Sequence, residues 1–409
     1  MKRVLVIGYV WPEPNSSAAG RHMMSILRLF KQQHWLVEFA TPAQTTEHMI
    51  DLAGEGILSQ SIELNSDSFD AYISDYHPDI VLFDRFMMEE QFGWRVEKNC
   101  PNAIKVLDTE DLQCLRHARH QAHKANREMT QQDLFNDLAK REIAAILRCD
   151  LSLIISSFEM ELLTDSFKVD AGLLHHLPFM VDLASLPDKT RPFAERKHFM
   201  TIGNFRHAPN WDQVLYLQQI WPLIQKQIPD AELHIYGSYP PPKATALNNP
   251  KKGFLIKGWA DNALDVIEQT RVCLAPIRFG AGMKGKLFDA MLVKTPSVTT
   301  SLGCEAMVQA DEQWPGMIAN TINDFVDASV RLYTDESIWG KSQNKAVKLL
   351  KDHYDGNRLG KQLINKIAGI DNNLAGVRLA NFTGAMLKHH TMMSTQYMSQ
   401  WIAEKNKRR

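Results

Sequence analysis

The sequence is poor in cysteine, carries almost no net charge and has no long apolar run. Its five cysteines lie far apart and form no C-x-x-C pair, which argues against a zinc site or a disulfide framework. The formal net charge is -1, so the charge balance requires no nucleic acid as a partner. No apolar run approaches the roughly 20 residues that a membrane-spanning helix needs. The apolar start of the chain is also too short for a signal peptide. We expect a cytoplasmic protein, with at most peripheral contact with the inner face of the membrane.

What is present is the composition of an ordinary globular protein, with 44% apolar and 23% charged residues over 409 positions. That length is comfortable for two domains. A near-continuous apolar run beginning at Val4 has the pattern of a strand buried on both faces of a parallel sheet. A polar loop and a helical pattern follow it, and this alternation repeats along the chain. The pattern is typical of a doubly wound α/β domain.

The alternation divides into two halves. Residues 185–197 are rich in charge, contain two prolines and hold few apolar residues, which predicts a linker. We therefore predict an N-terminal Rossmann-like domain at 1–184 and a C-terminal one at 198–372. A C-terminal helix, about 382–409, is expected to complete the first domain, with its basic end solvated. The large apolar residues of this segment are expected to be core contacts: Met386, Met392, Met393, Tyr397, Met398 and Trp401.

The segment with the clearest chemistry runs from Ala275 to Met291. A buried strand ends at Pro276, and three glycines within six residues then allow the backbone to turn sharply and approach a ligand. A helix follows, so its free N–H groups and positive dipole end face the same place. Lys284 and Lys286 lie in the first turn, where cations are disfavoured unless an anion sits among them. The segment predicts a phosphate site.

Two other phosphate-binding classes do not fit the sequence. The dinucleotide fingerprint G-x-G-x-x-G does not follow the first strand, and no G-x-x-x-x-G-K-[ST] motif occurs. Because the glycine loop lies deep in the second half, the C-terminal domain is expected to hold the phosphorylated ligand.

Five segments of the second half together resemble the GT4-like glycosyltransferases. They are Ile202–Asp212, Ile228–Ser238, Lys257–Asp261, Ala275–Met291 and Thr299–Glu305. The first half matches only in outline, through its first strand, its Ser/Ala/Gly loop and the Ser156-Ser157-Phe158-Glu159 segment. The resemblance implies the GT-B fold, in which two Rossmann-like domains face a central cleft. It also implies sugar transfer from a nucleotide diphosphate, with retention and without metal.

Carried over by position, Arg206 and Lys286 are the catalytic residues that the resemblance implies, and both approach the donor diphosphate. Asp289 matches the second acid of the family's E-x7-E motif, which binds the ribose. Trp259 lies in the segment that borders the base. The donor-binding residues implied are Gly203, Asn204, Trp259, Gly280, Gly282, Met283, Lys284, Gly285, Asp289 and Glu305.

The sequence departs from the family pattern at two positions. The first acid of the E-x7-E motif falls on Ala281, so no carboxylate there can hold the transferred sugar. Asn204 stands near a position where many relatives carry a basic residue. Glu305 is our candidate for partly replacing the missing acid.

Candidates on the acceptor side are polar residues that follow strands of the first half, where open α/β sheets place ligands. They are Gly20, Arg21, Asp84, Asp108 and Glu110. Asp108 and Glu110 also have a spacing that other glycosyltransferases use for a metal. We expect no metal and no cofactor, because the lysines of the glycine loop already supply positive charge.

We predict a glycosyltransferase that acts on a glycan, lipid-linked or other acceptor. A nucleotide-sugar 2-epimerase on the same fold is one alternative, although Ala281 leaves few acid or base groups around the sugar. A degenerate sugar-nucleotide-binding protein without catalysis is the other, supported by Ala281 and Asn204.

Overall fold

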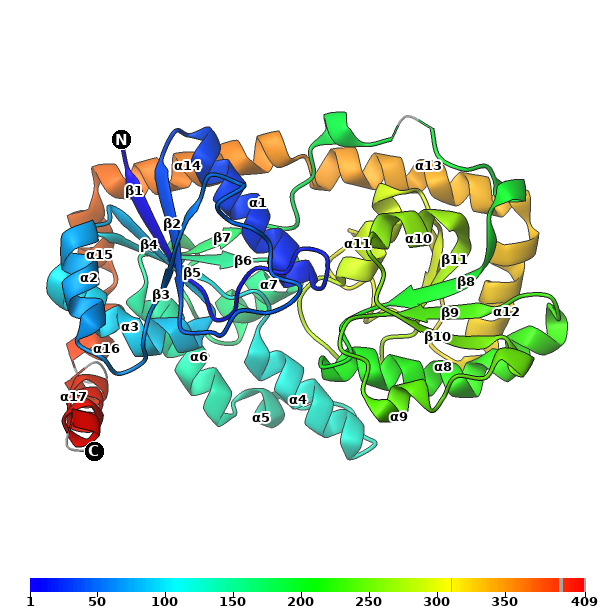
Figure 1. Ribbon diagram of the computed structural model, residues 1–409, viewed down its shortest axis with the longest axis horizontal. Coiled ribbons are helices and arrows are strands. Elements are labelled where there is room, and N and C mark those ends of the chain that lie inside the picture. The colour runs from blue at the N-terminus through cyan, green and yellow to red at the C-terminus, as the bar shows by residue number, and fades with distance from the viewer. Residues whose placement is uncertain (188, 310, 390–392, 408–409) are drawn as a thin grey trace.

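The computed structural model describes residues 1–187, 189–309, 311–389 and 393–407. Over these residues the chain forms two lobes, each built on a parallel sheet, and Figure 1 shows them side by side. The sheet of the first lobe has the order β3-β2-β1-β4-β5-β6-β7. Its strands are β1 (Arg3–Ile7), β2 (Leu36–Thr41), β3 (Leu58–Ser61), β4 (Ile80–Asp84), β5 (Ile104–Asp108), β6 (Leu151–Ile154) and β7 (Leu174–His176).

Helices cover both faces of this first sheet. They are α1 (Ala18–Gln32), α2 (Ser68–Tyr76), α3 (Phe86–Asn99), α4 (Gln113–Lys124), α5 (Gln131–Leu134), α6 (Asp137–Arg148) and α7 (Ser157–Asp165). Alternate residues of β1 point to opposite faces, so Val4 and Val6 pack in one buried cluster and Leu5 and Ile7 in another. Burial on both faces explains the continuous apolar run in the sequence.

The second lobe repeats the architecture with the strand order β10-β9-β8-β11-β12-β13. Its strands are β8 (Lys197–Ile202), β9 (Leu233–Tyr236), β10 (Phe254–Gly258), β11 (Thr270–Ala275), β12 (Ser297–Thr299) and β13 (Gly316–Ile318). Its helices are α8 (Ala208–Gln227), α9 (Pro242–Thr245), α10 (Ala263–Gln269), α11 (Gly285–Leu292), α12 (Ile322–Thr334) and α13 (Glu336–His353). In both sheets the parallel strands end towards the other lobe, so the loops after the strands meet between the lobes.

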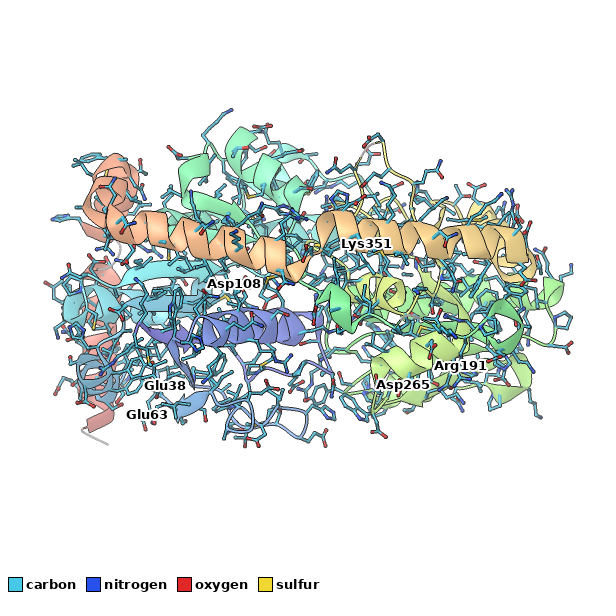
Figure 2. All side chains as sticks on the ribbon, turned by 90° about the horizontal axis from the view of Figure 1, so that it is seen from above. Glu38, Glu63, Asp108, Arg191, Asp265 and Lys351 are labelled. Carbon is cyan, nitrogen blue, oxygen red and sulfur yellow. The ribbon has the colours of Figure 1, made fainter. Side chains whose placement is uncertain are left out.

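The chain returns from the second lobe to the first between α13 and α14 (Gly356–Asn372). Figure 2 shows these helices end to end along the long axis, with Lys351 near their junction. We expected residues up to 372 to belong to the second domain. Four residues of α14, Leu359, Leu363, Ile367 and Ile370, instead pack in the buried cluster of the first lobe that contains β1. Both α13 and α14 have the pattern of a helix with one apolar side, and this pattern does not indicate which lobe covers that side.

The two passages of the chain between the lobes lie side by side. The Val181 N–H donates to the Tyr354 carbonyl at 2.9 Å, and the Gly356 N–H donates to the Val181 carbonyl at 2.8 Å. Val181 and Asp355 thus form a parallel bridge. The outgoing and returning segments are joined where the lobes meet.

The C-terminal helices α15 (Leu374–Ala380), α16 (Phe382–Leu387) and α17 (Met393–Lys407) lie on the first lobe, where α16 contacts α6 and α17 contacts α3. The expectation that their large apolar residues are core contacts was wrong. Met386, Tyr397, Met398 and Trp401 are exposed, since α17 packs through the small residues Ser399 and Ala403. The side chains of Met392 and Met393 lie outside the described residues. None of the helices in the described ranges is both long and apolar enough to cross a membrane.

The packing of α14 predicts that it stabilises the first lobe. Leu363 is fully buried, so Leu363→Ala should lower the free energy of unfolding by ~2–5 kcal/mol, since it leaves a cavity. Urea unfolding followed by circular dichroism would measure the change. Lys361→Ala, on the exposed side of the same helix, should change it by less than ~0.5 kcal/mol. Equal effects of the two changes would contradict the assignment of α14 to this core.

Candidate active site between the lobes

The glycine loop joins β11 to α11 at the boundary between the lobes. Its backbone is left-handed at Gly282, where φ is 61°. A Cβ atom there would lie 2.8 Å from the Cβ of Asp111 in the first lobe. At Gly285 a Cβ would lie 2.3 Å from the Cβ of Ala18, at the start of α1. Glycine is therefore required at both positions, because the first lobe closes directly over the loop.

Lys284 and Lys286 are directed away from bulk solvent. The Lys284 ammonium donates to the Gly282 carbonyl at 2.8 Å, and this side chain is 8% exposed. The Lys286 ammonium donates to Oδ1 of Asn210 at 2.8 Å and to Oε1 of Gln213 at 2.6 Å, both near the start of α8. Burial lowers the pKa of Lys284, and it lowers the pKa of Lys286 to about 8.

Within the described residues, the hydrogen-bond partners of Lys286 are two neutral amide oxygens, which solvate this partly buried cation without neutralising its charge. A buried charge is costly unless it is paired. The N-terminus of α11 adds its free N–H groups and positive dipole end next to the same side chain. The arrangement favours an anion at this place, in agreement with the phosphate site predicted from the sequence.

One N–H of the loop is already engaged by the first lobe. The Gly282 N–H donates at 2.8 Å to Oε1 of Glu159, which also accepts from the Leu112 N–H at 3.2 Å. Glu159 is fully buried in α7. Burial and the neighbouring Asp111 raise the pKa of Glu159 to about 8. The carboxyl group therefore holds the loop while carrying little negative charge at neutral pH.

Two ion pairs cross between the lobes beside this loop. Arg21 of α1 binds Asp289 of α11 through two hydrogen bonds, one of them at 2.9 Å between Nη2 and Oδ2. Burial lowers the pKa of Arg21 to about 10. Arg119 of α4 binds Glu305 through two hydrogen bonds of 2.8 and 2.7 Å, and it also donates to the Gly280 carbonyl at 2.9 Å. The expected ribose ligand and the expected substitute acid are both paired with arginines of the first lobe.

Residues that follow β8 and β9 of the second sheet lie on the other side of the boundary between the lobes. Gly203 follows β8 and lies against the Asn210 side chain. The Asn204 amide donates to the Ser16 hydroxyl at 3.4 Å, and the hydroxyls of Ser16 and Ser238 are 2.8 Å apart. The loop after β1 therefore meets the residues that follow β8 and β9. Met283, the remaining predicted loop residue, is buried in the cluster that packs α11.

An aromatic group lies at the same boundary. The Trp259 ring stacks on His48 of the first lobe at 3.8 Å with an interplanar angle of 1°. Tyr239 lies 5.2 Å from His48 and donates its hydroxyl to Glu13 at 2.9 Å. Arg206 is exposed, and its guanidinium lies 3.7 Å above the Tyr239 ring. Trp259 and Arg206 thus share one aromatic cluster that extends across both lobes.

Three of the acceptor-side candidates come together in the first lobe. Asp84 and Asp108 end the neighbouring strands β4 and β5 as register partners, and Glu110 follows with φ of 61°. All three are buried, and one oxygen each of Asp84 and Asp108 has no hydrogen-bond partner in the described residues. Burial and the Asp84 charge raise the pKa of Asp108 to about 7; burial and the Asp108 charge raise the pKa of Glu110. Gly20 instead packs within α1 against the Glu13 backbone.

Several residues at this boundary were not predicted from the sequence. They are Glu13, Ser16, His48, Arg119 and Glu159 of the first lobe and Asn210, Gln213, Ser238 and Tyr239 of the second. Four of them, Ser16, Glu159, Asn210 and Ser238, stand in segments that resembled the family. Their partners are far away in the chain, so the spacing of residues could not identify them.

A cavity of about 400 Å³ lies beside these contacts, at the junction of α13 and α14. Ser157 of the first lobe, Ala306 and Met307 of the second, and Tyr354 and Arg358 at the junction are among its lining residues. It therefore lies next to the loop that carries Glu305 and opens onto both lobes.

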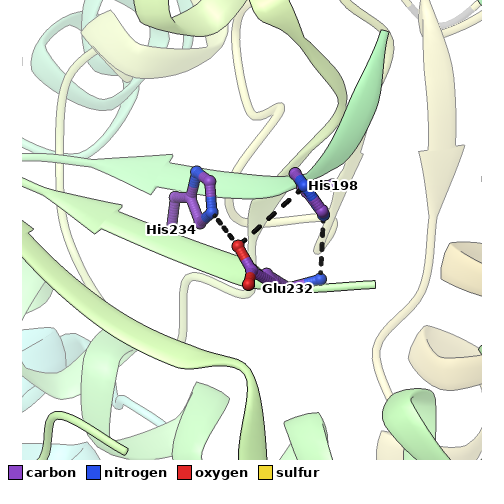
Figure 3. A group of neighbouring side chains, drawn as sticks. All are labelled: His198, Glu232 and His234. Carbon is purple, nitrogen blue, oxygen red and sulfur yellow. Dashed lines mark hydrogen bonds and ion pairs between the residues drawn. The ribbon is translucent and has the colours of Figure 1, made fainter. Parts of the chain in front are cut away.

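One group of possible metal ligands occurs in the described residues, and it lies away from the loop. His198, Glu232 and His234, at the starts of β8 and β9, bring their ligand atoms within 4.8 Å of one another (Figure 3). His234 Nε2 is 2.7 Å from the Glu232 carboxylate. His198 Nδ1 accepts the Glu232 N–H at 3.2 Å, so a neutral ring carries its proton on Nε2. That proton faces the carboxylate, and a carboxylate-imidazole cluster fits this arrangement better than a metal site.

The chain is similar to known proteins in part of its sequence and in its fold. Residues 196–335 match the model of the family described as glycosyl transferases group 1. The structure is similar to TarM, with a TM-score of 0.70 and 11% identity over 90% of this chain and 98% of that one. It is similar to Anabaena HepE in complex with UDP and glucose, with a TM-score of 0.68 and 11% identity over 90% and 100%.

A mutant S. aureus TarM in complex with fondaparinux, α-GlcNAc-glycerol and UDP gives a TM-score of 0.58 and 15% identity over 73% of this chain and 57% of that one. No curated protein sequence matches the chain. At these identities the structures show the fold, which is the GT-B fold of glycosyltransferases. The predicted fold class is confirmed, and the match over residues 196–335 confirms the resemblance of the second lobe to glycosyltransferases.

The pKa of Glu159 predicts a pH-dependent stability. The carboxyl holds its proton more tightly in the folded chain, with a pKa of about 8 against an ordinary 4.5. It therefore makes the free energy of unfolding fall as pH rises through that window. Glu159→Gln keeps an acceptor for both N–H groups and removes the titration. The variant should gain on the wild type by about 1 kcal/mol per pH unit between these values. Parallel pH curves from urea unfolding would contradict the assignment.

Proposed function

We propose that this protein is a glycosyltransferase that takes a sugar from a nucleotide diphosphate, with UDP as the first nucleotide to test, and works with retention and without a metal. The observation that carries the proposal is the partly buried Lys286 ammonium at the N-terminus of α11, whose hydrogen bonds in the described part of the chain go to two neutral amide oxygens. The family match of residues 196–335 and the UDP complex of the similar HepE structure support it.

The second lobe supplies what the leaving group requires. Negative charge develops on the diphosphate as the bond to the sugar breaks, and preorganised donors stabilise that charge. Lys286 and the first N–H groups of α11 serve as these donors, and Lys284 holds the loop through the Gly282 carbonyl. Arg206 is a further cation at the rim, and its stacking on Tyr239 leaves the guanidinium N–H groups at its edge for phosphate oxygens.

Binding of the donor must change the hydrogen-bond partners of two carboxylates, Asp289 and Glu305, which are now paired with arginines. In the proposal Asp289 accepts from the ribose hydroxyls, and these would share or replace its bonds to Arg21. Arg21 is then available to the diphosphate or the acceptor. Glu305 is the proposed substitute for the acid missing at Ala281, because Arg119 binds Glu305 and also donates to the carbonyl of the adjacent Gly280. The ion pairs are therefore expected to reorganise when the donor binds.

The first lobe is proposed to bind the acceptor. Asp84, Asp108 and Glu110 form a buried acidic group with unused acceptor oxygens, which suits hydroxyl groups of a glycan. A raised pKa at Asp108 also makes it a candidate to take up the acceptor proton near neutral pH.

Replacing Lys286 tests the donor site. Lys286→Ala should weaken UDP binding by ~1–3 kcal/mol in calorimetry and reduce sugar transfer in parallel, because the diphosphate loses a charged partner. Wild-type affinity should also fall as pH rises above about 8, where the free lysine loses its proton, and the variant should lack this fall. Lys251→Ala, an exposed lysine of the same lobe, is the control and should leave both unchanged.

If Lys286→Ala binds UDP as tightly as the wild type does, the proposed location of the donor site is contradicted. Incubation of the wild type with UDP-sugars alone separates a transferase from an epimerase, since an epimerase changes the sugar without an acceptor. Binding without transfer or hydrolysis across a broad acceptor screen would indicate a protein that only binds the nucleotide sugar.

A further inference from the structure

The C-terminal helix α17 exposes its large apolar side chains to solvent, which is unusual for a helix that packs on a protein core. Tyr397, Met398 and Trp401 are 60%, 64% and 63% exposed, whereas Ser399 and Ala403 are 4% and 8% exposed. Residues 397 and 401 are one turn apart, so they stand on one side of the helix, and residues 399 and 403 stand on the other. The large apolar side chains therefore point outward, and the small residues form the contact with α3.

The inward contact is specific, so the orientation of α17 is defined. Arg95 of α3 is fully buried and donates to the Ser399 hydroxyl at 3.3 Å. The same guanidinium is paired with Asp70. Turning α17 to bury Trp401 would remove Ser399 from this arginine and force an indole into a contact shaped for serine and alanine. The exposure of the aromatic side chains is thus imposed by the packing.

The helices before α17 add to the same end of the molecule. Leu379 of α15 and Phe382 and Met386 of α16 are 84%, 75% and 47% exposed. Of the fourteen large apolar residues that are exposed in the described part of the chain, six lie between residues 374 and 407. Figure 1 shows α15, α16 and α17 together at the outer end of the first lobe, away from the second lobe. Such a concentration marks an interaction surface.

The positive charge of the segment from residue 393 onward indicates the kind of partner that this surface binds. The Lys405 ammonium lies 5.1 Å from the Trp401 ring centroid, one turn along the exposed side. From residue 393 to the end, the sequence has four basic residues, Lys405, Lys407, Arg408 and Arg409, and one acidic residue, Glu404. Tyrosine and tryptophan beside lysine suit the boundary between lipid headgroups and acyl chains, and clustered basic residues are attracted to anionic lipids.

We propose that the outer side of α17, with Tyr397, Met398, Trp401 and Lys405, binds the surface of a membrane that contains anionic lipids. Lys405 beside the exposed aromatic rings favours an anionic partner, whereas a second copy of the chain would present the same positive charge. The aromatic and methionine side chains enter the headgroup region while the Lys405 ammonium pairs with lipid phosphates. The binding itself does not depend on the proposed transfer reaction; it would place the first lobe, and with it the proposed acceptor side, at the membrane.

Vesicle sedimentation tests the proposal with the full-length protein. Vesicles of phosphatidylglycerol and phosphatidylethanolamine should retain the wild type at low salt, and phosphatidylcholine vesicles or 1 M salt should retain much less. The Tyr397→Ser/Trp401→Ser variant should bind about tenfold more weakly or worse, since it loses the inserted groups. Lys405→Gln should weaken binding about fivefold and reduce the salt dependence. Leu223→Ser, at a 43% exposed leucine of α8 in the other lobe, is the matched control and should bind as the wild type does.

Three outcomes would overturn the proposal. The wild type remains in the supernatant with anionic vesicles, the double variant binds as well as the wild type, or light scattering shows a wild-type dimer that the double variant converts to a monomer. The last result would assign the surface to a second copy. UDP binding measured on the same samples reports separately on the donor site, so loss of vesicle binding with intact UDP binding leaves the proposed function standing.

Discussion

The hydrogen bond from the Gly282 N–H to the Glu159 carboxyl group joins the two lobes at the loop on which the candidate site depends. The Arg21–Asp289 and Arg119–Glu305 pairs stand on either side of it. In each contact, a side chain of the first lobe pairs with a group of the second lobe, and Gly282 and Asp289 would otherwise be buried without that partner. The relative position of the lobes is therefore set by the same polar groups that are candidates for holding the donor, and a change in their partners is a change in the position of the lobes.

The lysines of the loop differ from these pairs, because their hydrogen bonds within the described residues go to neutral oxygens rather than to a carboxylate. Lys286 is solvated by two amide oxygens and Lys284 by a carbonyl of its own loop. Burial lowers the pKa of both lysines, as expected for a cation that is removed from water before an anion binds. Ala281 removes a carboxylate from the same place. The loop therefore carries one acidic group fewer than the family pattern that it resembles, and Glu305 is the proposed substitute.

The second lobe could be predicted from the sequence because its chemistry is local. Glycines, lysines and an aspartate within one strand-loop-helix unit fix their mutual positions through the backbone alone. The residues that complete the site are not local: Arg21 and Asp289 are 268 positions apart, and Arg119 and Glu305 are 186 positions apart. The lobe to which α14 belongs and the direction in which α17 faces are also set by tertiary contacts. Helical periodicity identifies an apolar side but does not say what covers it, and on α17 the small residues rather than the large ones make the contact.

The bridge between Val181 and Asp355 has a mechanical consequence. The lobes are connected by two chain passages that are hydrogen-bonded to each other, so neither can slide or twist independently of its neighbour. Two segments connected in this way bend readily about one axis, and they resist sliding and twisting of one lobe relative to the other. Opening of the lobes to admit a nucleotide would then be a hinge rotation about a single axis near residues 181 and 355. The loop at Gly282 would move together with the rest of the second lobe.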